Sequence, residues 1–115
     1  MAVSSSTIHS ETITGHSGDW SSGPIAAGTF DTLILDVALS SLSDQTLIMI
    51  SRIDAFGNLS MLWGAEEAAP GPIAESVDIG PCDGYSSSRA WAGDVQVDIN
   101  TTGTFSGTVS LMGRG

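Results

Sequence analysis

The chain has 115 residues and a formal net charge of -10, because 13 acidic residues stand against three arginines and no lysine. Binding to phosphates or to anionic lipid headgroups needs clustered Lys and Arg, so this composition excludes nucleic acid and membranes as expected partners. Only 14% of the residues are charged and 41% are hydrophobic, which is typical of one folded domain and unlike a disordered acidic tail.

Residues 1–28 are rich in Ser, Thr, Gly and His, with isolated apolar positions. This pattern predicts an extended N-terminal arm, carrying at most one edge strand, ahead of a β-sandwich domain over residues 29–115. An arm of this kind pairs with a partner's strand and inserts alternate side chains into pockets. We therefore expect the partner to contact Val3, Ile8, Ile13 and Trp20. We also expect removal of residues 1–18 to leave thermal stability almost unchanged, since a free arm is mobile.

Two strands are predicted next. Residues 32–40 place Leu and Val at alternate positions, with polar or small residues between them, which indicates a half-buried strand. Residues 46–54 are apolar on both faces and predict a central strand that is covered on both sides. The sequence DAFGN at 54–58 supplies a hairpin loop, and residues 59–63 return as a strand.

The following loop, residues 64–72, contains one short Ala and Glu helical turn that Pro70 closes. Residues 73–79 predict another strand. Residues 80–93 are irregular, and we expect Tyr85 and Trp91 to pin this loop across one end of the core.

Residues 94–111 alternate Val and Ile with polar side chains, then Thr and Gly interrupt, and a second alternating series follows. This pattern predicts a β-hairpin with one solvent-facing side. About seven short strands with frequent turns and almost no helix predict an all-β fold, a single antiparallel β-sandwich or jelly roll.

Residue types that carry chemistry are present without the context that chemistry needs. His9, His16 and Asp19 lie near several serines, but a hydrolase triad requires a rigid scaffold, and these residues fall in the predicted arm. The carboxylates lack the spacing of a calcium loop. The single Cys82 has no intrachain partner and is interpreted as a buried or half-buried thiol. The sequence predicts no catalytic residues, no metal and no cofactor.

The three tryptophans allow two interpretations. Trp20, Trp63 and Trp91 on a β-sandwich could form a platform on which sugars stack, as in carbohydrate-binding modules. Core or loop-pinning roles are favoured, because Trp63 ends an apolar strand and the three residues are far apart in sequence. Exposed, coplanar tryptophans would favour sugar binding, and buried ones would favour a structural role.

The order of the strands adds a resemblance. A strand DTLILDVALS, a Ser-rich turn, a strand TLIMISRID, a loop with Gly57 and Asn58, a strand that ends in Trp63 and the closing pair GDVQVDINTTGTFSGTVSLMG follow one another. Over residues 28–113 this order resembles small β-sandwich virion proteins of tailed bacteriophages, which include capsid decoration proteins and head or tail accessory proteins.

The resemblance implies a non-enzymatic virion structural protein, and the expected function is capsid decoration, in which the chain binds and stabilises the outer surface of a phage-like shell. The implied partners are the major capsid protein or another virion protein, and copies of the chain itself in a trimer or other small oligomer. A head-tail or tail accessory protein and a carbohydrate-binding or adhesion module are the alternatives. The sequence shows no signal peptide pattern and no apolar stretch of 18 residues, so we expect synthesis in the host cytoplasm and a final location on the virion.

Overall fold

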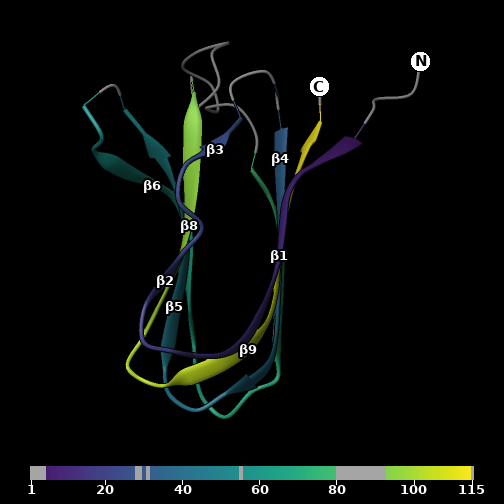
Figure 1. Cartoon of the computed structure of the whole chain (residues 1–115). Helices are drawn as coiled ribbons and strands as arrows, with labels where there is room; N and C mark the ends of the chain where they lie inside the picture. The colour runs from purple at the N-terminus through teal and green to yellow at the C-terminus, as the bar shows by residue number, and fades with distance from the viewer. Residues whose placement is uncertain (1–4, 28–29, 31, 55, 80–92, 115) are drawn as a thin grey trace.

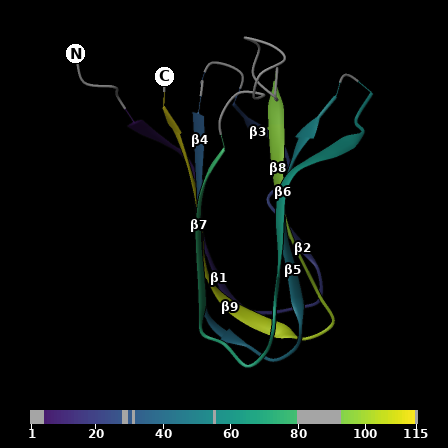
Figure 2. The same ribbon diagram turned by 180° about the vertical axis from the view of Figure 1, so that it is seen from behind.

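The computed structural model describes residues 5–27, 30, 32–54, 56–79 and 93–114, and its strands form two antiparallel sheets that face each other (Figures 1 and 2). The strands are β1 (Ser5–Ser17), β2 (Trp20–Ser21), β3 (Ile25–Ala26), β4 (Thr32–Leu42), β5 (Thr46–Ile53), β6 (Leu59–Glu67), β7 (Ile73–Ile79), β8 (Asp94–Thr101) and β9 (Thr104–Arg114). Sheet A has the order β1-β9-β4-β7, and sheet B has the order β2-β8-β5-β6, with β3 also paired to β8.

The strand order is that of a jelly roll. Strands β2 and β3 both pair with β8, so they share one strand position, and the nine elements fill eight positions. Apart from this interrupted strand, β5 and β6 are the only consecutive described strands that lie in the same sheet; every other step along the chain changes sheet. Eight antiparallel strands in two such sheets define the jelly-roll architecture. The predicted all-β sandwich is confirmed.

The core lies between the sheets and is built mainly by the four central strands, β4, β9, β5 and β8. Alternate side chains of each strand point inward, as the period of an extended chain requires. Complete burial of one such aliphatic or aromatic side chain contributes about 1.5 to 3 kcal/mol. The largest fully buried side chains are Leu33, Leu35, Val37, Leu39, Ile48, Ile50, Val95, Val97, Ile99, Phe105 and Leu111.

The turn between β4 and β5 and the turn between β8 and β9 close one end of the sandwich, and hydrogen bonds join the two turns. The hydroxyl of Thr102 donates to a carboxylate oxygen of Asp44 at 2.6 Å, and the N–H of Thr104 donates to the hydroxyl of Ser43 at 2.7 Å. The bond from Thr102 is the main cause that lowers the pKa of Asp44. A Cβ atom at Gly103 would collide with the Ser43 hydroxyl, so this close approach requires glycine.

The predicted hairpin over residues 94–111 is wrong in its pairing, although both of its strands exist. Strand β8 pairs with β5 in sheet B, whereas β9 pairs with β1 and β4 in sheet A. Each strand buries one face, which is why both show the alternation expected of a hairpin. The turn between them crosses from one sheet to the other.

The predicted loop over residues 64–72 is shorter than expected. Strand β6 continues to Glu67, and Ala65 and Glu67 pair with Ile48 and Thr46 of β5, so a strand replaces the predicted helical turn. The predicted roles of Cys82, Tyr85 and Trp91 concern residues that lie outside the described ones. Within the described residues there is no helix long and apolar enough to span a membrane.

The N-terminal residues differ most from the sequence-based expectation. Strand β1 pairs with β9 from Ser5 to Ser17, interrupted by two register shifts, and forms one edge of sheet A. Ile13, Trp20 and Ile25 are buried in the core. Residues 5–27 are therefore part of the sandwich and contribute strands to both of its sheets. Their isolated apolar side chains find their partners within the chain itself.

Replacement of Leu35 by Ala is expected to lower the free energy of unfolding by about 2 to 5 kcal/mol, because a buried isobutyl group leaves a cavity. The neighbouring Asp36 points to the outer face of sheet A and is only partly buried. Its replacement by Ala is expected to be nearly neutral. Denaturant unfolding of both variants measures the difference, and equal small losses would contradict the assigned orientation of β4.

Replacement of Ile13 by Ala is expected to destabilise the chain by about 2 kcal/mol or more, because its side chain is buried in the core. The exposed neighbour Thr12 provides the matched control, and Thr12→Ala is expected to be neutral. Loss of residues 1–18 is now expected to lower the melting temperature, in contrast to the prediction from sequence. Thermal melts test all three changes. An unaltered melting temperature of the Ile13 variant would support the interpretation of residues 1–18 as a mobile arm.

Candidate functional site

The two sheets present different outer faces. The outward residues of β4, β7 and β9 in sheet A are mostly small and polar, and they line only shallow hollows. They include Ala38, Ser40, Ala74, Ser76, Ser106 and Thr108. Sheet B instead carries large apolar side chains on its outer face, contributed by β5 and β6. A solvent-facing surface of this second kind requires a physical explanation.

The pairing of β5 with β6 and β8 defines the outer residues of sheet B. Met49 lies opposite Gly64 and Asp98, whereas its neighbours Ile48 and Ile50 point into the core. We call the outward apolar residues of these two strands, together with the phenylalanine at the tip of their hairpin, the apolar face of sheet B. It consists of Leu47, Met49, Ile53, Phe56, Leu59 and Met61.

The hairpin residues of the apolar face of sheet B are strongly solvent-exposed. Phe56 is 90% exposed, Met61 63% and Leu59 49%, and these are the exposed large hydrophobic residues among those described. A Cβ atom at Gly64 would lie 2.8 Å from the sulfur of Met61 and 3.5 Å from Cγ of Met49, so both methionines border the gap that Gly64 leaves. Leu47 and Met49 are half-buried.

The hairpin tip is held in a defined shape. The N–H groups of Phe56 and Asn58 donate to the same carboxylate oxygen of Asp54 at 2.8 and 2.9 Å. These bonds, that of Asn58 first, lower the pKa of Asp54. Gly57 takes the positive φ of +84° that the turn needs. Phe56 is therefore exposed by a well-bonded turn and not by a lack of local structure.

A β-bulge turns the hairpin away from the sandwich. The pairing shifts between Ile50 and Ser51, which face Trp63 and Met61, so Leu62 is the extra residue. A bulge bends its strand and increases the local twist. Figures 1 and 2 show the hairpin end of β5 and β6 leaning away from sheet A. Arg52 pairs with the buried Val95 of β8, yet Arg52 is exposed because the bulge directs its end of β5 away from sheet A.

A row of polar residues on β8 borders the apolar face of sheet B. Asp94, Gln96, Asp98 and Asn100 alternate with the buried Val and Ile of that strand, so they point outward. The amide of Gln96 donates to both carboxylate oxygens of Asp98 at 3.0 and 3.1 Å. Glu66 on β6 lies opposite Leu47 and adds an exposed carboxylate. We call Asp94, Asp98 and Glu66 the acidic border.

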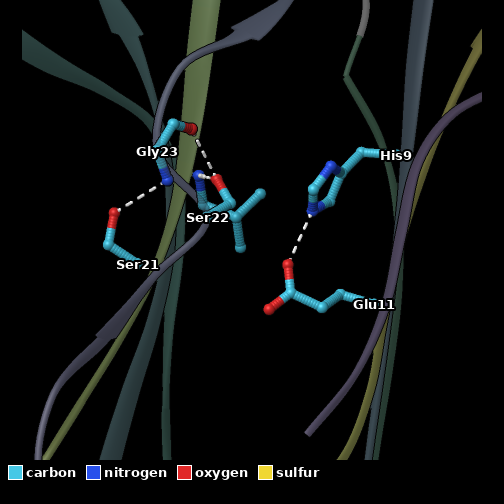
Figure 3. Close-up of polar contacts among 6 residues, drawn as sticks. His9, Glu11, Ser21, Ser22 and Gly23 are labelled. Atoms are coloured by element: carbon cyan, nitrogen blue, oxygen red, sulfur yellow. Dashed lines mark hydrogen bonds and ion pairs between the residues drawn. The ribbon is translucent and has the colours of Figure 1, made fainter.

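His9 and Glu11 form the base and acid pair that a triad would need, but none of the described serines is hydrogen-bonded to His9. Nε2 of His9 lies 3.0 Å from Oε1 of Glu11, and both side chains point toward the turn at Ser22 (Figure 3). The Ser22 hydroxyl donates to the carbonyl of Gly23 at 2.8 Å and accepts from the N–H of Val97 at 3.0 Å. Among the described residues, no hydrogen bond joins His9 to a serine.

His16 and Asp19 have structural contacts at the corner between β1 and β2. Nε2 of His16 donates to the carbonyl of Asp19 at 2.9 Å, and its ring packs on Phe105 with 5.5 Å between centroids. The carboxylate of Asp19 accepts the N–H of Thr101 at 3.0 Å. The described residues contain no group of three or more His, Cys, Asp or Glu that could hold a metal ion.

The residues predicted to contact a partner are placed elsewhere than expected. Ile8 packs against the core, Ile13 and Trp20 are buried within it, and Val3 lies outside the described residues. The interpretation of Ile8, Ile13 and Trp20 as exposed anchors is therefore corrected: β9 and the core already cover them. Trp63 is also packed against the core, so neither it nor Trp20 forms an exposed platform for sugars.

The apolar face of sheet B was not predicted from the sequence, although the sequence contains a signal for it. Residues 46–54 are apolar on both faces and predicted a strand covered on both sides. In the described part of the chain, β5 is central in sheet B, as predicted, but its outward Leu47 and Met49 are only half-buried, whereas its inward Ile48 and Ile50 are fully buried. Comparison with protein-family models, with curated proteins and with solved structures found no match to this chain.

Glu67 and Glu75 lie close together on β6 and β7, which are edge strands of sheets B and A. Both occupy inward positions of edge strands, β6 and β7. A hydrogen bond that the protonated Glu67 carboxyl donates to Glu75, followed by burial and by the negative charge of Glu75, raises the pKa of Glu67 above its ordinary value of 4.5. The folded chain therefore binds this proton more tightly than the unfolded chain does.

Glu67→Gln is expected to raise the melting temperature at pH 7. The contribution of Glu67 to stability is present at low pH and is lost as pH rises from the unfolded value through the raised folded pKa, where two carboxylates repel. The gain is expected to shrink below pH 4.5. Thermal melts at both pH values measure it, with Glu66→Gln as the outward-facing control. A gain of equal size at both pH values would contradict the shared proton.

Proposed function

We propose that the chain is a capsid decoration protein, a non-enzymatic component that binds the outer surface of a phage-like shell and stabilises it. The observation that carries this proposal is the apolar face of sheet B, where Phe56 and Met61 remain exposed on a fold whose core is complete without them. Contiguous exposed apolar side chains with a polar border mark sites of protein interaction.

The architecture supports the same proposal. Jelly rolls with two sheets occur in viral capsid and lectin domains, although a fold by itself does not define a function. The segment order over residues 28–113 also resembles virion proteins of tailed phages. Between the two uses of the fold, the burial of Trp20 and the packing of Trp63 against the core favour a structural protein over a sugar-binding one. Assembly of copies into a trimer or other small oligomer on the shell remains a prediction.

The test is co-sedimentation of the purified chain with undecorated shells assembled from the major capsid protein of the same virus. We expect saturable binding to the shells and a higher temperature of shell disruption when the chain is bound, because a ligand of the assembled state stabilises that state. Shells already saturated with the unlabelled chain serve as the control. Failure of the intact, folded chain to sediment with the shells would overturn the proposal.

A further inference from the structure

We propose that the apolar face of sheet B is the surface that seats on the shell, and that its counterpart there is an apolar recess flanked by Arg or Lys side chains. This inference rests on the proposed function and specifies the partner surface. It is carried by the adjacency of the apolar face to the acidic border, both of which are on the outer side of the same three strands.

The pairing of β8, β5 and β6 places these groups side by side. Asp98, Met49 and Gly64 occupy one row of the sheet, and Gln96, Ser51 and Met61 the next outward row. Neighbouring strands are about 4.8 Å apart, so the carboxylate of Asp98 borders the apolar column directly. Asp94 and Asp98 are four residues apart on one strand, which corresponds to about 13 Å. The partner is expected to present two basic groups at a similar spacing.

Phe56 is suited to be the anchor of this contact. Aromatic side chains that fill a pocket dominate many protein interfaces. The two bonds to Asp54 and the glycine at position 57 fix the turn before any partner binds. Little backbone entropy is then lost on binding, which favours affinity. The hairpin end of β5 and β6 also leans away from sheet A (Figure 1), and Phe56 is 90% exposed.

The charge distribution favours a basic partner over a second copy of the chain. Two copies joined through this face would bring Asp98 and Glu66 of one near the same residues of the other, at a net charge of -10 for each chain. Like charges across an interface are unfavourable. Arg52, the described cation nearest in sequence to the hairpin tip, belongs to the row of Val95 on the inner side of sheet B.

The experiment compares shell binding of single-residue variants by co-sedimentation at low and at high salt. Phe56→Ser and Met61→Ser are each expected to weaken binding at least tenfold, and Asp98→Asn to weaken it about threefold and reduce its salt dependence. The matched controls are Met112→Ser and Asp36→Asn on the outer face of sheet A, both expected to bind normally. Melting temperatures verify that every variant is folded.

The outcomes separate this inference from the proposed function. If the intact chain binds shells and the Phe56 and Met61 variants bind equally well, the inference fails while the decoration function stands. If the intact chain does not bind shells at all, the proposed function itself fails. If analytical ultracentrifugation shows an oligomer of the intact chain that Phe56→Ser and Met61→Ser dissociate, the face joins copies of this chain, and the inference is overturned.

Discussion

The packing of β4 and β9 against β5 and β8 is the interaction on which the rest of the structure depends. These four strands supply the largest fully buried side chains. They come as two consecutive pairs, β4 with β5 and β8 with β9, from separate parts of the chain, so no local segment contains the core by itself. The edge strands β1, β7, β2, β3 and β6 attach to this centre by pairing. Loss of one central side chain therefore disturbs the packing of both sheets, because the core is as densely packed as an organic crystal.

The core is complete without the exposed apolar residues of the β5–β6 hairpin, so core packing does not explain why they are apolar. Phe56, Leu59 and Met61 add nothing to the space between the sheets, and a bulge at Leu62 directs their hairpin away from it. Large exposed apolar groups favour aggregation unless a partner covers them. The acidic border and the net charge of -10 oppose contact between copies of the chain through this face. The same charges are complementary to a basic surface.

Two groups among the described carboxylates have different structural environments. Asp44 and Asp54 accept hydrogen bonds inside turns, which lowers the pKa of each and keeps both ionised as parts of the fold. Asp94 and Asp98 stand on the outer face of a strand, beside the apolar face of sheet B. Composition counts all of these residues alike as acidic, whereas their positions separate carboxylates that are hydrogen-bonded in turns from carboxylates on the outer face of a strand.

The sequence by itself determined the all-β class, most strand positions from β4 to β9 and the inward direction of Leu35 and Val37, because alternation along an extended chain is a local property. It did not determine which strands pair. Residues 94–111 read as a hairpin yet divide between the two sheets, and residues 5–27 read as an arm yet complete sheets A and B. Alternation states that one face of a strand is buried, but pairing depends on contacts between residues far apart in sequence. For the same reason, only the tertiary structure decided that β5, apolar on both faces, is covered on one and presents Leu47 and Met49 on the other.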